Sequence, residues 1–344
     1  MSFREKRFLL FMPEYVMGGA ETQFRYLIEY AEQRNWKLDV IIEHRFKTED
    51  SLLKRDSAKM RNVRFYEMTG CGNDRNRIIR YTVCHILRTI LKVKYGSCLI
   101  QHAPDIVLVP ILRSFGIRVI YSERVDAAAI NKNPSWIRCL RYCNRITANS
   151  AYAQKKLEKL TGKRVALIRN GKPIVQQLPM KSEREMLRVL IPARIMPHKN
   201  QILMLRYLKE HPEFVGKMIF AGVVEDRAYQ RKLIGFVNRN HLQERVEFLG
   251  YVEKIQEEYE KADLIILPSL AEGTPNVVLE AFAYGRPVIV SDIDTERDIV
   301  TDSQFRFKPN DVKEIDKCIR YIRDLSDEEY KRLLDDNRKF VLEN

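Results

Sequence analysis

The sequence predicts an α/β protein built from two doubly wound domains in tandem. Two consecutive series of short apolar strands alternate with amphipathic helices. An irregular, proline-containing stretch at 172–187 separates the two series. The length of 344 residues suits two domains of ordinary size, and a composition of 45% hydrophobic and 31% charged residues is typical of globular proteins.

The first series forms the predicted N-terminal domain, residues 1–171. A Gly-Gly turn leads from its first strand into its first helix, and Ser150 is a good N-cap for its last helix. The expected strands lie at 7–15, 37–44, 62–68, 105–110, 118–123, 145–150 and 164–171. The expected helices lie at 16–35, 75–96 and 150–162.

The second series forms the predicted C-terminal domain, residues 188–326, and a terminal helix follows at 327–344. Gly285 is a good C-cap for the helix that begins after Pro275. The expected strands lie at 187–195, 217–223, 245–252, 264–269 and 287–292, and a further helix lies at 226–240.

The stretch 271–292, AEGTPNVVLEAFAYGRPVIVSD, joins two predicted strands through a turn and a helix. Glu272 follows the first strand, Glu280 lies in the first turns of the helix, and Gly273 and Pro275 lie in the turn. Ligands of open α/β sheets bind at this edge, and a helix N-terminus suits a phosphate. Carboxylates accept hydrogen bonds from hydroxyls, so the stretch predicts a sugar-nucleotide site. Alternatively, Glu280 is only a partner of the helix dipole.

Three further groups of residues follow predicted strands. Arg194 and Lys199 follow the first strand of the second domain. Their two positive charges could neutralise a diphosphate. Alternatively, they are only a pair of solvent-exposed cations. Gly18 and Gly19 let the backbone approach a ligand, or form a plain tight turn. Glu123, Arg124 and Asp126 lie at the carboxyl end of a strand, or in an ordinary surface loop.

Several chemistries are disfavoured by the motifs. The nearest approach to a dinucleotide-binding G-x-G-x-x-G, at 70–75, has Arg75 in place of the third glycine. The six histidines are not spaced as metal ligands, and the six cysteines fit reduced thiols. We therefore expect no metal and no cofactor.

The positive charge lies wholly in the first half of the chain. Residues 1–170 hold 32 Lys and Arg against 16 Asp and Glu, a balance of +16, while residues 171–344 hold 28 against 30, a balance of −2; the sum is the net charge of +14. The segment 75–94 combines six basic residues with an apolar set at helical spacing. Such a half suits nucleic acid, an anionic membrane surface or an acidic substrate.

The compartment is predicted from the ends and the apolar runs. No apolar run reaches the ~18 residues of a membrane helix, and the start of the chain reads as a strand and not as a signal peptide. We expect a cytoplasmic protein that is peripheral on the inner face of the cell membrane.

The chain resembles the retaining glycosyltransferases of family 4, which have the GT-B fold of two Rossmann-like domains facing a cleft. The resemblance runs over most of the chain in the family's order. Its most specific part is the E-x7-E motif of Glu272 and Glu280 with its flanks. Its other parts are GGAE, ITANSAYAQKKL, LIRNG, ARIMPHKN, VEFLGYVE and ADLIILPS.

This resemblance implies roles for single residues. Glu272 would contact hydroxyls of the donor sugar, Glu280 would hold those of the ribose, and Arg194 and Lys199 would bind the diphosphate. The acceptor would lie on the first domain, and the helix 327–344 would cross back to it. The other implied donor-binding positions are Gly18, Gly19, Gly250, Thr274, Pro275, Asn276 and Val277.

One position departs from the family. Many members carry a histidine after a middle strand of the first domain, in a pattern like T-x-H, where this chain reads YSER with Arg124. Some relatives of polysaccharide assembly share an S-x-R variant. The role of Arg124 toward donor, acceptor or leaving group is left open.

The function expected is transfer of a hexosyl group, with retention, from a nucleotide-sugar. We expect a UDP-sugar in preference to a GDP-sugar, and a glycan or undecaprenyl-type lipid-linked acceptor in surface polysaccharide synthesis. The enzyme alternative is a sugar-nucleotide epimerase of the same fold. The alternative outside enzymes is a nucleic-acid-binding protein, which leaves Glu272 and Glu280 unexplained.

Overall fold

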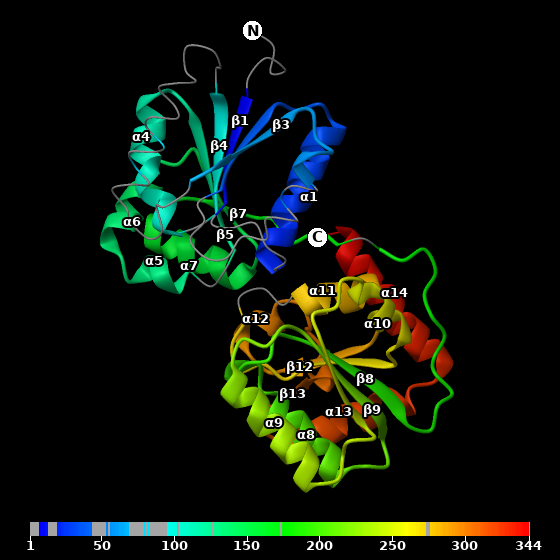
Figure 1. The fold of residues 1–344 in the computed structure, drawn as a ribbon. Helices are drawn as coiled ribbons and strands as arrows, with labels where there is room; N and C mark the ends of the chain where they lie inside the picture. The colour runs from blue at the N-terminus through cyan, green and yellow to red at the C-terminus, as the bar shows by residue number, and fades with distance from the viewer. Residues whose placement is uncertain are drawn as a thin grey trace. The chain divides into compact units, whose positions relative to one another are not determined.

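The computed structural model describes residues 7–12, 19–42, 53, 56–68, 79, 82, 95–101, 103–124, 127–172, 174–272 and 276–343. The chain divides into two compact units, Met1–Arg169 and Asn170–Asn344 (Figure 1). This division falls close to the predicted domain end at 171. The described residues between 172 and 186 carry no helix or strand.

The first unit is built on a parallel sheet. In its described part the sheet has seven strands in the order β3-β2-β1-β4-β5-β6-β7. Alternate residues of β1 enter two separate cores: Leu9 and Phe11 join one, Leu10 and Met12 the other. Burial on both faces explains why β1 is an unbroken apolar run.

The elements of the first unit have the following bounds: β1 Arg7–Met12, α1 Gly19–Gln33, β2 Leu38–Ile42, β3 Val63–Glu67, β4 Tyr95–Ile100, the 3₁₀ helix η2 Ala103–Leu108, α4 Val109–Ser114, β5 Arg118–Glu123, α5 Ala128–Asn131, α6 Pro134–Leu140, β6 Arg145–Ala148, α7 Ala151–Thr161 and β7 Val165–Leu167.

One predicted strand of this unit is wrong. Residues 105–110 lie in η2 and α4, and the central strand is β4, which begins inside the predicted helix 75–96. A short apolar run does not distinguish a strand from a buried helix, and Gly96 and Ser97 weaken the strand signal of β4. Apart from Ile79 and Thr82, residues 75–94 lie outside the described residues.

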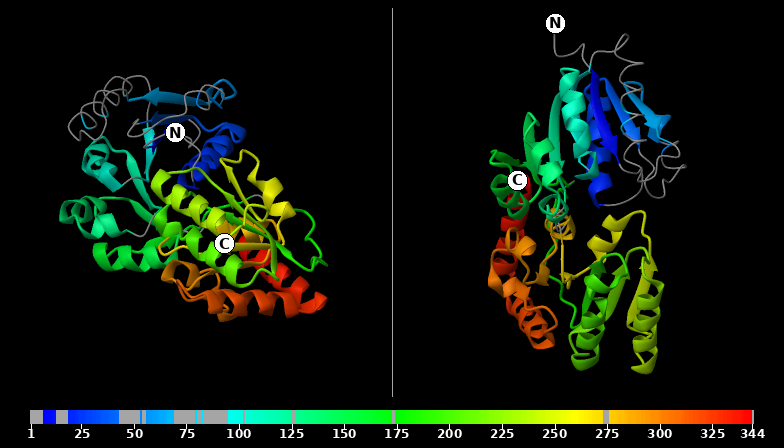
Figure 2. Two further views of the ribbon diagram at one scale, coloured as in Figure 1. Left: turned by 60° about the horizontal axis from the view of Figure 1, so that its bottom comes forward. Right: turned by 90° about the vertical axis from the view of Figure 1, so that its left-hand side faces the viewer.

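The second unit holds a parallel sheet that has, among the described residues, six strands in the order β10-β9-β8-β11-β12-β13. The chain runs outward from β8 to β10 and then returns to β11 on the other side of β8. Because such crossovers are right-handed, helices cover both faces. Helix α8 packs against α9, and α14 packs against α11 (Figures 1 and 2).

The elements of the second unit have the following bounds: β8 Leu187–Pro192, η3 Pro197–Lys199, α8 Gln201–Glu210, β9 Val215–Ala221, α9 Arg227–Arg239, β10 Val246–Gly250, α10 Ile255–Lys261, β11 Leu264–Leu267, α11 Asn276–Ala283, β12 Val288–Ser291, α12 Asp294–Arg297, η4 Ser303–Phe305, β13 Arg306–Phe307, α13 Val312–Asp324 and α14 Asp327–Glu343.

The terminal helix α14 lies where the sequence predicts a helix. Within the second unit its Phe340 ring meets the Phe282 ring of α11 edge-on, with the centroids 6.0 Å apart. Its crossing to the first domain stays a prediction.

Candidate functional site

The predicted donor-binding residues of the second unit gather at one edge of its sheet. The reversal of strand order between β8 and β11 is a topological switch point, where open α/β sheets bind ligands. The loop after β8 carries Arg194 and Lys199, and the loop after β11 carries Glu272. Parallel strands end at the same edge, so the topology brings these charges together.

Lys199 and Glu272 form an ion pair, with Nζ and Oε1 2.5 Å apart. Their side chains are only 13% and 11% exposed. The loop that carries Lys199 is fixed on both sides, because the carbonyl of His198 accepts from the Leu270 amide at 2.8 Å and Asn200 donates to Asn310 at 3.1 Å. A partly buried cation beside a carboxylate suits a diphosphate and a hydroxyl-bearing sugar.

The pKa of His198 is influenced by several charges of this edge. Its pKa is lowered, first by burial and then by the nearby charge of Lys199. Glu272 and Glu225 oppose this shift of the pKa, and Arg194 adds to it. The charges of Lys199, Glu272, Arg194 and Glu225 therefore all act on the His198 side chain. Because its pKa is lowered from the usual histidine value, His198 is predominantly neutral at pH 7.

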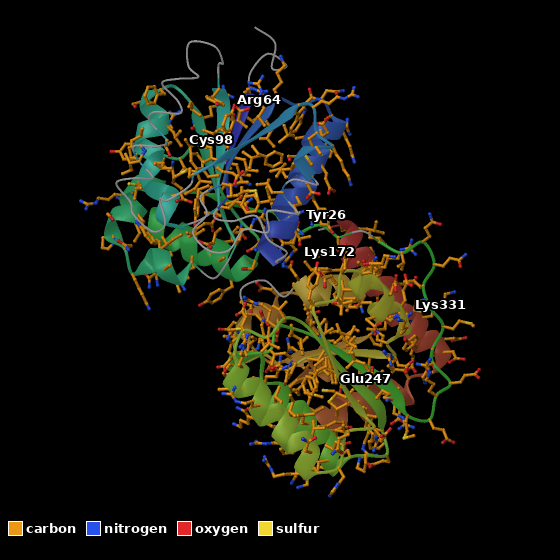
Figure 3. All side chains as sticks on the ribbon, in the orientation of Figure 1. Tyr26, Arg64, Cys98, Lys172, Glu247 and Lys331 are labelled. Carbon is orange, nitrogen blue, oxygen red and sulfur yellow. The ribbon has the colours of Figure 1, made fainter. Side chains whose placement is uncertain are left out.

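Glu280 lies in α11 and has two donors of its own. Its Oε1 accepts from Nζ of Lys172 at 2.6 Å, and its Oε2 accepts from the hydroxyl of Tyr259 at 2.8 Å. The Lys172 side chain is 4% exposed and that of Glu280 is 22% exposed. Burial and the charge of Glu280 raise the pKa of Tyr259 well above its usual value, so the phenol stays a donor. Lys172 is labelled in Figure 3.

The start of α11 is partly described. Asn276, its first residue, accepts from the amide of Asn170 at 2.6 Å, and Val277 packs against the core of the second unit. Thr274 and Pro275 lie outside the described residues, so their predicted contacts with phosphate stay predictions.

Arg194 lies at the surface, with a side chain 54% exposed, and pairs with Glu225. Its carbonyl accepts from Gln201 at 2.8 Å. Gly222 after β9 lets the backbone approach this loop closely, because a Cβ there would lie 2.2 Å from the Ala193 carbonyl oxygen. Arg194 thus lies on the predicted edge, where it is paired with the carboxylate of Glu225.

Gly250 ends β10 in a left-handed conformation, with φ of 64°. Its carbonyl accepts from the Gly222 amide at 2.8 Å. Leu249 and Tyr251 on either side are 38% and 52% exposed. Exposed apolar and aromatic surface of this kind suits a nucleobase, and the donor-binding role of Gly250 stays a prediction.

In the first unit, Arg124 follows the carboxyl end of β5. Its amide donates to the buried Glu123 at 3.0 Å, and Tyr121 donates to the same carboxylate at 3.0 Å. Burial lowers the pKa of Arg124 to about 10, which Glu123 partly opposes, so Arg124 is charged at pH 7. Gly19 begins α1, while Gly18 lies outside the described residues.

Four residues connected to the charges of this edge were not predicted from the sequence. They are Lys172, Glu225, Tyr259 and Glu296. Lys172 directly follows Asn170 and Gly171 of the LIRNG motif, a signal that was readable in the sequence. Tyr259 and Glu296 carry no such signal, because their burial and neighbours come only from the fold.

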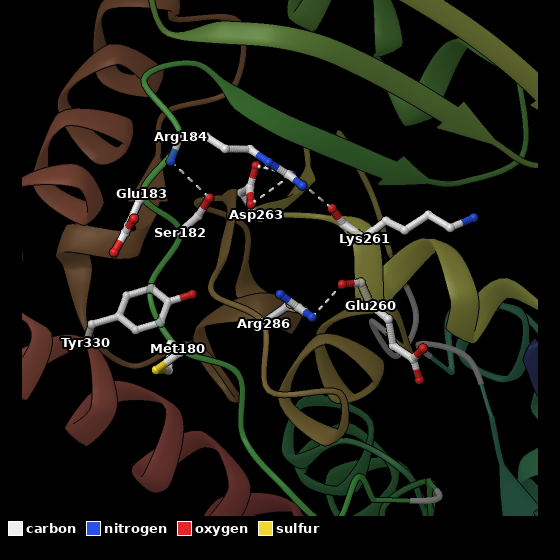
Figure 4. Close-up of a pocket in the computed structure, with 9 residues that line it drawn as sticks. All are labelled: Met180, Ser182, Glu183, Arg184, Glu260, Lys261, Asp263, Arg286 and Tyr330. Atoms are coloured by element: carbon white, nitrogen blue, oxygen red, sulfur yellow. Dashed lines mark hydrogen bonds and ion pairs between the residues drawn. The ribbon is translucent and has the colours of Figure 1, made fainter.

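A cavity of about 530 Å³ lies at the opposite edge of this sheet (Figure 4). Asp263 precedes β11 and Arg286 precedes β12, so the cavity adjoins the amino ends of these strands. Its cations are engaged: Arg184 pairs with Asp263 at 3.0 Å and Arg286 donates to the Glu260 carbonyl at 2.6 Å. None of the predicted site residues lines it.

Two negative findings concern the described residues alone. They contain no cluster of three or more His, Cys, Asp or Glu side chains placed to hold a metal ion. They also contain no helix with the length and apolar character needed to cross a membrane.

The second unit matches a known family. Residues 178–340 match the family model described as glycosyl transferases group 1. The chain is 30% identical over 133 residues to the O-antigen chain mannosyltransferase RfbU of Salmonella typhimurium, covering 38% of this chain and 37% of that protein. It is 26% identical over 220 residues to a Campylobacter jejuni α-1,4-N-acetyl-D-galactosaminyltransferase acting on an undecaprenol-linked glycan, covering 60% of this chain and 58% of that protein. The matches thus span less than two thirds of each relative.

Solved structures share the fold over almost the whole chain. HepE from Anabaena, solved in complex with UDP and glucose, has a TM-score of 0.78 at 17% identity and covers 98% of this chain and 95% of its own. Sucrose-phosphate synthase from Thermosynechococcus elongatus has a TM-score of 0.76 at 15% identity, covering 98% of this chain and 94% of its own. The predicted fold class of two Rossmann-like domains of the GT-B type is confirmed.

Proposed function

We propose that the protein is a retaining glycosyltransferase that moves a hexosyl group from a nucleotide-sugar to a glycan or lipid-linked acceptor. The donor we propose is a UDP-sugar in preference to a GDP-sugar. The process we propose is the synthesis of a surface polysaccharide.

The observation that carries this proposal is the pairing of the E-x7-E carboxylates. Each has a lysine within 2.6 Å, Lys199 for Glu272 and Lys172 for Glu280. Each pair combines a cation for phosphate with an acceptor for hydroxyls, and both lie where the sheet topology favours a ligand.

The comparisons support this chemistry. The match to glycosyl transferases group 1 covers the unit that contains both pairs. The Salmonella and Campylobacter relatives are transferases of O-antigen and of an undecaprenol-linked glycan. They lend no support to the epimerase alternative or to nucleic-acid binding.

The charges suggest how transfer proceeds. Negative charge grows on the leaving diphosphate, and cations placed in advance stabilise it. Lys199 and Arg194 are such cations, held by Glu272 and Glu225 in this structure. We infer that the diphosphate draws Lys199 from Glu272, which leaves the carboxylate free to accept from sugar hydroxyls. Neither step requires a metal ion or a cofactor.

A lipid-linked acceptor would be met at an anionic membrane surface. The +16 balance of residues 1–170 supports docking of the first domain there. Tyr30 and Trp36 are 43% and 41% exposed, and the Arg34 guanidinium lies 5.2 Å from the centroid of the Tyr30 ring. Aromatic rings beside cations are typical of membrane interfaces. The segment 75–94, which first suggested this docking, lies almost wholly outside the described residues.

Calorimetry with nucleoside diphosphates tests the proposal first. We expect UDP to bind the whole protein more tightly than GDP, and donor screening with product analysis to reveal transfer with retained anomeric configuration. A protein that bound no nucleoside diphosphate would exclude the proposed activity.

A further inference from the structure

Glu296 is a buried acid for which the fold gives no structural reason. It lies in α12, the short helix after β12, and has no exposed surface. Within the described part of the chain, neither of its carboxyl oxygens has a hydrogen-bond partner. Burying an unpartnered carboxyl group is unfavourable, and such groups concentrate at functional sites.

Other buried polar groups lie at the same edge. The hydroxyls of Ser269, Ser291 and Thr295 are also buried and without a partner among the described residues. Ser269 follows β11, Ser291 ends β12 and Thr295 follows it, and these two neighbouring strands run in parallel. Several buried groups without a partner among the described residues therefore lie at the edge that carries Glu272.

The charges that act on Glu296 belong to the proposed site. Burial raises its pKa well above the usual carboxyl value, and the charge of Glu272 raises it further. Lys199 opposes this shift of the pKa, and Asp292 adds to it. Asp292 is itself held by Arg297, with Oδ1 and Nε 2.7 Å apart. Full burial without a hydrogen-bond partner therefore favours the protonated form of Glu296, and the charges of Lys199 and Glu272 both act on this carboxyl group.

A protonated Glu296 could donate a hydrogen bond to Glu272, which an ionised Glu296 could not do. If Glu296 were ionised, Lys199 would face two carboxylates and a diphosphate would meet an excess negative charge. Once Lys199 moves to the diphosphate, Glu272 loses the ammonium that now lies 2.5 Å from it. A protonated carboxyl donates a strong O–H bond to a carboxylate.

We propose that Glu296 is a positioning residue of the donor site, which replaces Lys199 as hydrogen-bond donor to Glu272 when the diphosphate binds. This inference rests on the proposed function. No hydrogen bond joins the two residues in this structure, so the proposed role requires the Glu296 carboxyl group to come within hydrogen-bond distance of Glu272 when the diphosphate binds. The proton stays on Glu296, so Glu272 remains ionised and accepts from the donor sugar.

Two variants of similar size test this role. Glu296→Gln keeps a donor but does not titrate, and Glu296→Met has no donor. We expect the Gln variant to keep kcat within about threefold of wild type at pH 7. We expect the Met variant to lower kcat roughly tenfold or more, since a hydrogen bond to a charged group is lost. Its affinity for the nucleoside diphosphate should change by less than about twofold.

Thermal unfolding separates this role from a structural one. Because an unpartnered buried acid is replaced by an apolar side chain, the Met variant should melt at a higher temperature than wild type. A Met variant that melts higher and turns over more slowly supports the proposal. A Met variant with wild-type kcat overturns it.

The dependence of kcat on pH gives a second test. This test needs only the wild type and the Gln variant, so it remains available if the Met variant does not fold. Glu296 is a donor below its raised pKa and is lost as a donor above it. Wild-type kcat should therefore fall as the pH rises through that pKa, while the Gln variant keeps its rate. The same alkaline limb in both proteins overturns the inference but leaves the proposed function intact. Wild-type protein that transfers no sugar from any donor overturns both.

Discussion

The ammonium of Lys172 lies 2.6 Å from Oε1 of Glu280, although the two residues are 108 positions apart in the chain. Lys172 belongs to the segment that leads into the second sheet, and Glu280 lies on α11. The remaining oxygen of Glu280 is bound by Tyr259, whose ring stacks on that of Tyr284 with the centroids 5.1 Å apart. The carboxylate is thus set in place before any ligand binds.

Replacement of Lys172 by Met should destabilise the protein. Removing one partner of a buried pair leaves the other charge uncompensated, and Glu280 keeps only Tyr259 as a partner, so we expect a loss of about 2 kcal/mol. Urea unfolding of Lys172→Met, Glu280→Gln and the double variant measures the coupling. A coupling energy below about 0.5 kcal/mol would show that the pair contributes little.

Glu280→Ala and Glu272→Ala should affect different steps. Loss of Glu280 removes contacts to the ribose, which donor and free nucleotide share, so nucleotide affinity falls. Loss of Glu272 removes contacts to the transferred sugar, so kcat falls more than nucleotide affinity. Calorimetry with the nucleoside diphosphate and steady-state kinetics measure the two effects. Equal losses of nucleotide affinity in both variants would contradict this division.

Arg194→Ala and Lys199→Ala should each weaken diphosphate binding about ten- to a hundredfold, because a charged hydrogen bond contributes roughly 1.5–3 kcal/mol. Glu225→Gln releases Arg194 from its partner and should strengthen binding. Lys331→Ala, an exposed change on α14, serves as the control. Unchanged affinity in both the Arg194 and Lys199 variants would refute the assignment.

The first domain should bind anionic vesicles reversibly, since each Lys or Arg near an anionic surface contributes about 1 kcal/mol. Sedimentation with anionic and neutral liposomes at low and high salt measures this. Arg34→Glu should weaken the binding, and Lys331→Glu in the second domain should not. Equal partitioning to neutral and anionic vesicles, or no effect of salt, would favour a soluble acceptor.

The local pattern of the sequence was sufficient for most of the architecture. The elements β11, α11 and β12 lie where the sequence predicts a strand at 264–269, a helix after Pro275 and a strand at 287–292. A buried apolar strand, a Gly-x-Pro turn and a helical period are each encoded by neighbouring residues. The strand prediction at 105–110 was wrong, since a short apolar run is compatible with either a buried helix or a strand. The strand β4 was missed because Gly96 and Ser97 weaken its strand signal.

The sequence by itself determined that Arg194, Lys199 and Glu272 reach the carboxyl edge of the second sheet, because parallel strands place the loops that follow them together. Only the tertiary structure decided their partners and their charge states. Lys199 meets Glu272 and Lys172 meets Glu280 through contacts 73 and 108 positions apart. The pKa of Glu296 is raised because the fold removes this carboxyl group from water and because the charge of Glu272 acts on it. Burial and the distance between charges set a pKa, and neither is encoded by adjacent residues.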